Sequence, residues 1–395
     1  MVGAVGEPRK ARIAVITTHV RGLGPSNHLE QYLVPRCRTV LAVDHPLIHS
    51  VPTISTFRLY EEGRLVREGS RETRVSEPVR FVLDVMLTVY WTFRFAPRFD
   101  LFVGVDALNC ISGLIARPLS RGKRVIFYVI DWSPRRFAGR ILNGVYHFSD
   151  RFAALCATET WNQSHAIDEG RWPGRFWGMI GERAKRRVRI VPNAVQKVDD
   201  GILQESRQPY RLVFLGHLLE KQGLQLVIRA LPEVARRLPE VELIVVGTGP
   251  YEKELRELAS SIGVLDRVRF LGYVEDEEEV LRLLASASCG LAPYLAGPDS
   301  FSQFADPGKI KNYLAVGLPV LMTDVPYNAR DLERKGCAFV VQDNLGDIAS
   351  GIIEALSEDA DSRAYRRTQA LESMKGLDWH SVFGQALAAD KLIAC

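Results

Sequence analysis

The chain has 395 residues, which at roughly 150 residues per domain predicts two or three domains. Apolar residues make up 47% of the chain and charged residues 25%, which is typical of globular proteins and excludes disordered and fibrous classes. Its six cysteines are scattered singly, without a CxxC pair, which argues against a zinc knuckle or a disulfide framework and predicts a reducing, cytoplasmic compartment. The formal net charge is only +4, and we expect no nucleic-acid partner.

The first ten residues, MVGAVGEPRK, are too short and too polar to form the apolar core of a signal peptide, and no run of 18 apolar residues occurs elsewhere. We therefore expect neither a membrane span nor export by that route. The positive residues gather most densely in GERAKRRVRI, residues 181–190. Such a run is explained simply by a solvated face. The alternatives are attraction to a phosphorylated substrate or to an anionic membrane, and the second would place the protein at the inner face of that membrane.

In the first half, short β-branched and aromatic runs alternate with runs of helical period, which predicts a parallel sheet with crossover helices. The polar stretch 194–209 then loses apolar periodicity, which indicates a domain boundary. The strands predicted before this boundary are 12–17, 39–44, 101–105, 124–130, 152–158 and 188–193.

The second half repeats the alternation, so the predicted fold class is α/β, with two Rossmann-like, doubly wound parallel-sheet domains at 1–200 and 209–376. A C-terminal helix at 377–395 follows, with Asp378 as its cap and an apolar side that needs a partner in either domain. The apolar side consists of Trp379, Val382, Phe383 and Leu387. The strands predicted in the second half are 211–216, 241–247, 268–274, 289–294, 319–324 and 338–343.

The stretch FADPGKIKNYLAVGLPV, residues 304–320, reads as a short helix followed by a strand. Asp306 suits the N-cap, Pro307 the first helical position and Gly317 the end of the helix. Capping does not explain Gly308 and Lys309, because a lysine is disfavoured at the positive end of a helix dipole. A bound anion resolves the conflict, since first-turn amides, a bare glycine and an ammonium group together form a phosphate cradle.

Two further glycine turns follow predicted strands, the first at Gly216 and the second at Gly247 and Gly249. Ligands of open parallel sheets bind at the carboxyl ends of the strands, so three such turns predict one pocket rim. A single GTGP turn, taken alone, is more often a plain connection between a strand and a helix.

These segments resemble the donor-nucleotide half of the retaining family-4 glycosyltransferases, which have the GT-B fold. The resemblance rests on GHLLEKQGLQLVIRALP, VVGTGP, VRFLGYV and FADPGKIKNYLAVGLPV, in this order. It covers about residues 211–344, and more loosely the first domain at RIAVITTHVRGLGPSNHLEQYLV. The resemblance implies transfer of a sugar from a nucleotide-diphosphate sugar to a glycan or lipid-linked acceptor, with retention, without a metal or a cofactor, and in a cleft between two domains.

For the donor diphosphate, the resemblance implies roles for His217, Lys221 and Lys309. Lys309, with the amides of Gly308 and its own backbone, would neutralise the leaving diphosphate as the glycosidic bond breaks. Relatives commonly carry arginine and lysine where this chain has His217 and Gln222, and Lys221 stands one position early.

For the rest of the donor, the resemblance implies that Tyr273 stacks on the base, although a core aromatic at a strand end is an equal alternative. Asn312 and Phe304 stand where many relatives carry two glutamates. Asn312 could still hydrogen-bond a ribose diol, more weakly than a carboxylate. Asp306 could contact the sugar, but we prefer the capping role.

In the first domain, the resemblance places Gly22 and Gly24 against the donor phosphates, with Ser26 as a helix cap, and a plain glycine turn is the alternative. It assigns Asp131 to positioning of the acceptor. Arg135 and Arg136 could meet an anionic acceptor or simply be solvated.

The aromatic-rich stretch 81–99 has helical spacing that favours a buried face, and a surface helix that dips into lipid is the alternative.

Three other functions remain to be weighed. An epimerase or hydrolase acting on nucleotide sugars would need acidic or basic groups beside the sugar that the sequence does not reveal. A dehydrogenase would need GxGxxG and a later acid, and no turn supplies both. A non-catalytic sugar-nucleotide-binding subunit stays open because of His217 and Asn312.

Overall fold

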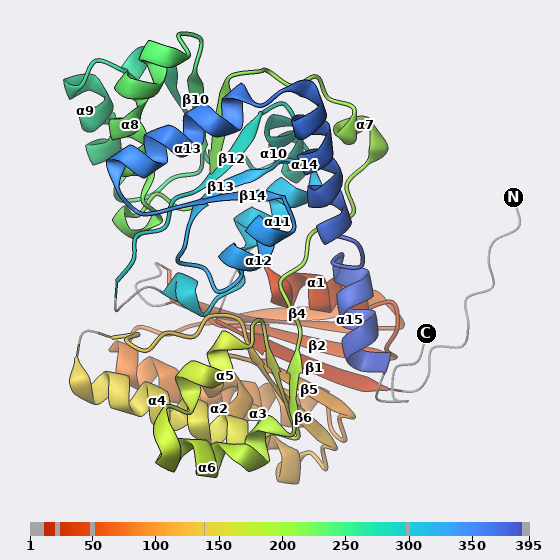
Figure 1. Cartoon of the computed structure of the whole chain (residues 1–395). Coiled ribbons are helices and arrows are strands. Elements are labelled where there is room, and N and C mark those ends of the chain that lie inside the picture. The colour runs from red at the N-terminus through yellow and green to blue at the C-terminus, as the bar shows by residue number, and fades with distance from the viewer. Residues whose placement is uncertain (1–11, 20–23, 48–51, 138, 298–300, 389–395) are drawn as a thin grey trace, which may run out of the picture. The chain divides into compact units, whose positions relative to one another are not determined.

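A computed structural model describes residues 12–19, 24–47, 52–137, 139–297 and 301–388 of the chain. The chain divides into two compact units, which Figure 1 shows as two bodies of helices and strands. The first unit runs up to Pro192 and takes in the chain again from Trp379, and the second comprises Asn193–Asp378. The predicted glycine at position 22 lies outside the described residues.

The first unit contains an eight-stranded sheet in the order β4-β3-β2-β1-β5-β6-β7-β8. The strands β3 and β4 form an antiparallel hairpin at one edge, and the other pairs, apart from β2 with β3, are parallel. The strands are β1 (Ile13–Thr18), β2 (Thr39–Asp44), β3 (Ile54–Glu61), β4 (Arg64–Glu72), β5 (Leu101–Val105), β6 (Arg124–Val129), β7 (Glu159–Asn162) and β8 (Val188–Ile190).

Two features of this sheet differ from the sequence prediction. Residues 152–158, predicted as a strand, end the helix α4 (Arg140–Cys156), and the strand β7 starts later, at Glu159. A short apolar run does not distinguish a strand from the buried side of a helix, and Ala153 and Ala154 supply that side. The hairpin β3–β4 was not predicted, because its outer strand is mostly exposed and polar.

Helices cover both faces of the first sheet (Figure 1). One face carries α1 and α15, and the other carries a layer in which α2 packs on α3, α3 on α4, and α4 on α6. The helices of this unit are α1 (Pro25–Leu33), α2 (Glu77–Phe95), α3 (Ala107–Leu119), α4, α5 (Ala166–Arg171), α6 (Gly174–Lys185) and α15 (Trp379–Ala388).

The C-terminal helix α15 finds its apolar partner in α1 of the first unit. The Trp379 ring stacks on His28 with centroids 4.7 Å apart, and the Phe383 ring lies 5.9 Å from Tyr32. The four residues predicted as its apolar side are all buried, which confirms the amphipathic pattern. Of the two partners that the sequence left open, the helix uses the first unit.

The second unit contains a six-stranded, wholly parallel sheet in the order β11-β10-β9-β12-β13-β14. Its strands are β9 (Arg211–Leu215), β10 (Glu242–Val246), β11 (Val268–Gly272), β12 (Cys289–Ala292), β13 (Val320–Thr323) and β14 (Ala338–Val341). Its helices are α7 (Asp200–Leu203), α8 (Leu224–Arg237), α9 (Glu252–Ser261), α10 (Glu277–Ala285), α11 (Gly308–Ala315), α12 (Ala329–Arg334), α13 (Leu345–Ser357) and α14 (Ala360–Ser373), with the short 3-10 helices η1 (Glu220–Gln222), η2 (Leu265–Arg267) and η3 (Phe301–Gln303).

The division between the units falls at residue 192, earlier than the predicted first-domain end at 200. The reason is that Ile202 of α7 is buried in a core cluster of the second unit, so the polar stretch before it already belongs to that unit. Among the described helices, none is both long and apolar enough to span a lipid bilayer.

Candidate functional site

The second sheet reverses its winding between β9 and β12. From β9 the chain moves outward to β10 and β11, and from β12 it moves outward in the other direction to β13 and β14. At such a switch point the loops after the two central strands diverge and leave a crevice at the carboxyl ends of the strands. The glycine turns predicted as the pocket rim follow β9 and β10 at this edge.

Lys309, in the first turn of α11, reaches across this switch point toward the end of β9. Its Nζ atom donates a hydrogen bond to Oε1 of Gln222 at 2.6 Å and lies 3.9 Å from the ring centroid of Phe214 and 5.1 Å from that of Tyr294. Among the described residues, no carboxylate forms an ion pair with this ammonium group. Burial therefore lowers the pKa of Lys309 to about 7.

The two glycine turns leave little room for side chains, and at Gly247 and Gly249 an added Cβ atom would clash with backbone. Gly216 has φ +135°, and a Cβ atom there would lie 3.2 Å from Cε of Lys309. Gly247 has φ +127°, and a Cβ atom there would lie 2.1 Å from the carbonyl oxygen of Gly216. A Cβ atom at Gly249 would lie 2.2 Å from the carbonyl oxygen of Leu218. The turns after β9 and β10 thus join backbone to backbone beside Lys309.

Three further predicted donor residues lie on the same edge. His217 is exposed, and its ring is close to Gly249, where an added Cβ atom would lie 2.7 Å from Cδ2 of the histidine. Tyr273 is 69% exposed and follows Gly272, whose carbonyl oxygen accepts a hydrogen bond from the amide of Gly247. This exposure argues against the core-aromatic alternative for Tyr273. Lys221 is an exposed residue of η1.

The predicted capping role of Asp306 is wrong. The helix α11 begins at Gly308 with Pro307 in the N-cap position and without a side-chain cap. The Asp306 carboxylate instead accepts a hydrogen bond from the amide of Asn193 at 3.0 Å and forms an ion pair with Lys311 at 3.3 Å. Burial raises the pKa of this carboxyl group, and these two partners oppose that shift. Asp306 therefore ties the first residue of the second unit to α11.

The bare Cα of Gly308 serves packing within the protein. An added Cβ atom would lie 3.0 Å from Nδ2 of Asn193, and that amide group donates a hydrogen bond to the backbone oxygen of Asp306. From the sequence we expected this glycine to let a ligand approach the backbone closely. In the structure the side chain of Asn193 lies beside it. Asn312, the residue at the second glutamate position, is half-buried in α11.

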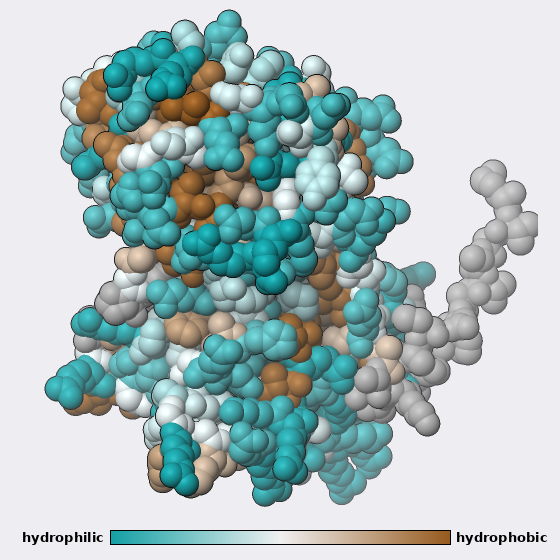
Figure 2. Space-filling model, in the orientation of Figure 1, coloured by the Kyte–Doolittle hydropathy of each residue, from teal (hydrophilic) through white to brown (hydrophobic). Residues whose placement is uncertain are grey.

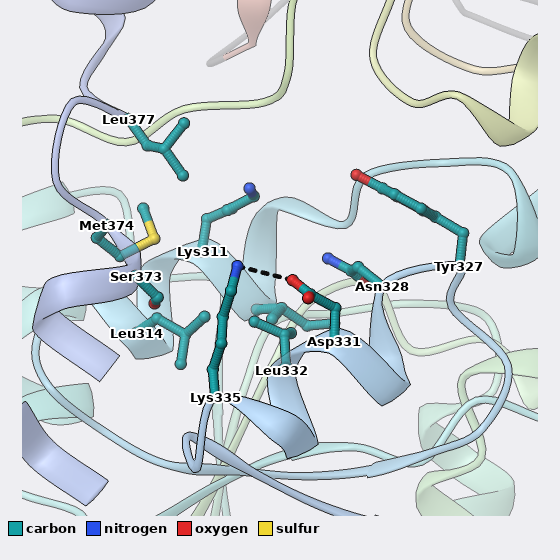
Figure 3. Close-up of a pocket in the computed structure, with 11 residues that line it drawn as sticks. Lys311, Leu314, Tyr327, Asn328, Asp331, Leu332, Lys335, Ser373, Met374 and Leu377 are labelled. Carbon is teal, nitrogen blue, oxygen red and sulfur yellow. Dashed lines mark ion pairs between the residues drawn. The ribbon is translucent and has the colours of Figure 1, made fainter. Parts of the chain in front are cut away.

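A pocket of about 280 Å³ lies on another side of α11, between this helix, α12 and the end of α14. Figure 3 shows Lys311 and Leu314 of α11 at this pocket, with the Asp331–Lys335 ion pair, 2.7 Å long, on the wall that α12 supplies. The residues predicted for donor binding do not line it. This pocket is therefore separate from the Lys309 side of the helix.

The first sheet has its own switch point, between β1 and β5. His19 follows β1, Asp106 follows β5, and His19 Nδ1 lies 3.1 Å from Asp106 Oδ2. Asp106 has φ +74° and ψ 172°, a strained conformation for a residue other than glycine, while its carboxylate caps α3 at the amide of Asn109. The side chain of Asp106 is 43% exposed, so this carboxylate can reach a ligand.

Behind Asp106 lies a buried network of polar side chains. His19 Nε2 is 3.4 Å from Oδ2 of Asp84 in α2, and Asp84 Oδ1 is 3.2 Å from Nδ1 of His45. Burial alone would lower the pKa of His19, but the charges of Asp106 and Asp84 and the hydrogen bonds to them raise it to about 9. Burial lowers the pKa of His45 despite Asp84. At neutral pH the network therefore holds a charged His19 between two carboxylates.

Other predicted residues of the first unit are placed as follows. Asp131 follows β6, the strand beside β5, and pairs with Arg136, so Arg136 is more than a solvated cation. Gly24 is the N-cap residue of α1 with an extended backbone, φ −167°, which any residue can adopt. Ser26 is not the cap, because α1 already starts at Pro25 and Ser26 is buried in its first turn.

Sequence reasoning missed His19, Asp106, Asp84 and Gln222. A usable signal existed for two of them, because Asp106 comes directly after a predicted strand and His19 two residues after another. Deciding that these two strands are neighbours across the switch point required the strand order. Asp84 lies within an apolar helix, where its inward direction cannot be read from residue types.

Comparison with known proteins was consistent with this geometry. The sequence model of the family described as "Glycosyl transferases group 1" matches residues 209–358. The chain is 28% identical over 218 residues to the phosphatidyl-myo-inositol mannosyltransferase of Mycolicibacterium smegmatis, covering 55% of this chain and 53% of that protein. It is 28% identical over 302 residues to the putative colanic acid biosynthesis glycosyltransferase WcaL of Salmonella typhimurium, covering 76% and 66% of the two chains. The alignment thus spans about half the length of the mannosyltransferase.

Among solved structures, Anabaena Alr3699/HepE in complex with UDP-glucose is similar to 96% of this chain and to 100% of its own, with a TM-score of 0.68 and 17% identity. At this identity the likeness concerns the fold, and it confirms the predicted GT-B class. Residues 209–358 of the second unit therefore match the group 1 glycosyltransferase family, in agreement with the predicted resemblance to the family-4 enzymes.

Proposed function

We propose that the protein transfers a sugar from a nucleotide-diphosphate sugar to a hydroxyl group of a glycan or lipid-linked glycan, with retention of the anomeric configuration. The observation that carries the proposal is the Lys309 ammonium group. It lies without a carboxylate partner among the described residues, at the switch point of a group 1 glycosyltransferase domain and beside a closely packed pair of glycine turns. A diphosphate leaving group would supply the missing negative charge.

In this proposal each group has one task. Lys309 and the amides at the start of α11 stabilise the charge that develops on the leaving diphosphate, without a metal. His217 and Lys221 assist at the diphosphate, Tyr273 stacks on the base, and Asn312 bonds the ribose. These assignments follow from the family resemblance together with the edge on which the residues lie.

On the acceptor side, we assign Asp106 to contact with the acceptor hydroxyl or the transferred sugar, with His19 as its positioning residue. The strain at Asp106 and its partly exposed carboxylate support this role. Asp131, after the next strand of the sheet, is a further acceptor-positioning residue and is oriented by Arg136. We place the reaction in the cytoplasm at the inner face of a membrane, since one relative is named for transfer to a phosphatidyl-inositol lipid.

A thermal-shift screen with UDP, GDP, ADP and TDP tests the donor site. One nucleotide should raise the midpoint, and Lys309→Ala should abolish the gain. Lys253→Ala, which removes an exposed lysine of α9, serves as the matched control and should keep the gain. If no nucleotide stabilises the protein, or if Lys309→Ala keeps the full gain, the donor site is placed wrongly.

Turnover then separates the candidate functions. Release of the nucleoside diphosphate only when an acceptor is present supports a transferase, and the anomeric configuration of the product, read by NMR, tests retention. Release without an acceptor identifies a hydrolase. Binding without turnover identifies the non-catalytic subunit that His217 and Asn312 leave open.

A further inference from the structure

The helix layer α2, α3, α4 and α6 of the first unit has its apolar and polar sides reversed. Four of the five buried residues of α2 are polar or charged, namely Arg80, Asp84, Thr88 and Thr92, and the fifth is Trp91. The outward side of α2 carries an apolar stripe in which each member is 48–60% exposed. The stripe consists of Val79, Val82, Met86, Tyr90 and Phe93. These spacings of three and four residues place all five side chains on one side of the helix.

The neighbouring helix α4 shows the same reversal. Ile141, Val145, Phe148 and Phe152 follow each other at spacings of four, three and four, and their exposed fractions are 84%, 55%, 70% and 41%. The buried residues of this helix are Asp150 and two alanines. These large apolar side chains of α4 therefore point to solvent, and small or charged residues face the protein interior.

The other two helices extend this surface on either side of α4. Ile115 and Leu119 are exposed on α3, and Phe176 and Met179 are 64% and 65% exposed on α6. Because α2 packs on α3, α3 on α4, and α4 on α6, the exposed groups belong to one continuous layer, which we call the helix face. In Figure 2 brown and tan residues reach the surface among teal ones in this unit.

The second unit shows the ordinary pattern, which makes the reversal a property of this layer. In α8 the buried residues include Leu224, Val227 and Leu231, while Arg229 and Arg236 are exposed. Monomeric proteins rarely leave large continuous apolar patches in contact with water, and such patches usually mark a binding surface.

The charges on the helix face indicate its partner. Exposed cations lie on or beside three of the helices, namely Arg117, Arg140, Arg175, Arg183 and Arg186. Of the four acids on these helices, Asp84 and Asp150 are buried, Glu77 at the start of α2 is half-buried, and Glu182 pairs with Lys185. A face that is apolar and basic is attracted to anionic lipid headgroups and can insert its apolar side chains at the headgroup boundary. A second copy of the chain, docked face to face, would bring like charges together.

We propose that the helix face docks the protein on the surface of an anionic lipid bilayer, with the side chains of α2, α4 and α6 entering the headgroup boundary. The inference rests on the proposed function only for its setting, since a lipid-linked acceptor would be met at such a surface. The docking itself is argued from the exposed side chains and is independent of sugar transfer.

Flotation of the whole protein with vesicles, without nucleotide, tests this proposal. We expect binding to vesicles of phosphatidylcholine with phosphatidylglycerol, weaker binding to phosphatidylcholine alone, and release by salt. Two double variants remove exposed apolar side chains: Ile141→Gln with Phe148→Gln in α4, and Phe176→Gln with Met179→Gln in α6. The affinity of each for the vesicles should fall at least about tenfold. Leu265→Gln with Leu345→Gln changes exposed apolar residues of the second unit and should bind like the original protein.

For the charges, Arg183→Gln with Arg186→Gln should weaken binding and reduce its salt dependence, whereas Arg229→Gln with Arg236→Gln on α8 should leave both unchanged. Absence of binding to either vesicle, or equal binding by all variants, would overturn the proposal. If the original protein is a dimer and the α4 or α6 variants are monomers, the helix face is an interface between two copies of the chain instead. The variants made for the vesicle assay should still be stabilised by the nucleotide in the thermal-shift assay. This parallel measurement distinguishes a failure of docking from a failure of the proposed transfer.

Discussion

Lys309 and His19 titrate far from their usual ranges, and the two shifts have opposite directions. Burial lowers the pKa of Lys309 to about 7, because no carboxylate of the described residues pairs with it. The pKa of His19 rises to about 9, because Asp106 and Asp84 outweigh the effect of its burial. His19 follows β1 at the switch point of the first sheet, and Lys309 reaches the end of β9 at the switch point of the second. A ligand can approach the sheet at both places.

For Lys309, we expect nucleotide-diphosphate binding to take up a proton above pH 7. The free protein is then partly neutral at this residue, and the phosphate charge favours the ammonium form. Calorimetry in buffers of different ionisation enthalpy measures the uptake, and affinity should fall as the pH rises through 7. Lys309→Arg keeps its charge over this range and should bind without uptake. Equal uptake by this variant would assign the proton to another group.

For His19, we expect the stability of the protein to fall as the pH rises through about 9. The folded-state pKa lies above the usual histidine pKa of 6.5, so the contribution of the ion pairs is complete below pH 6.5 and is lost as the folded-state group deprotonates. Denaturant unfolding across this pH range measures the change. His19→Gln should flatten the dependence, and His165→Gln, at an exposed position, should not. An unchanged slope in His19→Gln would rule out this network as the cause.

At the scale of the elements, the contact of α15 with α1 joins the last helix to the first. Phe383 is fully buried there, in ring contact with Tyr32 and Trp379. We expect Phe383→Ala to lower the free energy of unfolding by about 3–5 kcal/mol, because it leaves a cavity in this contact. Gln385→Ala, on the exposed side of the same helix, should change it by less than about 0.5 kcal/mol. Denaturant unfolding monitored by circular dichroism compares the two, and equal effects would contradict the packing of α15 on α1.

The elements themselves were largely predictable from residue types. The strands β1, β2, β5 and β6 of the first sheet and all six strands of the second fall within or close to predicted ranges, because their β-branched and aromatic runs end at turn residues. The exceptions have local reasons. The exposed hairpin β3–β4 lacks the apolar run of a buried strand. The end of α4 has such an apolar run, but there it forms the buried side of a helix.

At the scale of the molecule, the first unit is assembled from two separate parts of the chain. Truncation after Asp378 removes α15 and exposes the side of α1 that contains His28 and Tyr32. We expect hydrogen exchange to rise in α1, β1 and β2 of the truncated chain, while β9 to β14 keep their protection. Unchanged exchange in α1 would show that α15 contributes little to the first unit.

Residue types along the chain were enough to predict the α/β class, the two sheets, the glycine turns after β9 and β10, and the lysine at the start of α11. These features depend on neighbours along the chain, so short-range periodicity and turn chemistry reveal them. The folded arrangement was needed to see that Asp306 binds Asn193 and Lys311 instead of capping its helix, that Gln222 binds Lys309, and that His19 contacts Asp106. It also decided which side of α2 and α4 faces water. Each of these depends on strand order and on which helix packs on which face, and residues far apart in the chain carry no local signal of their contact.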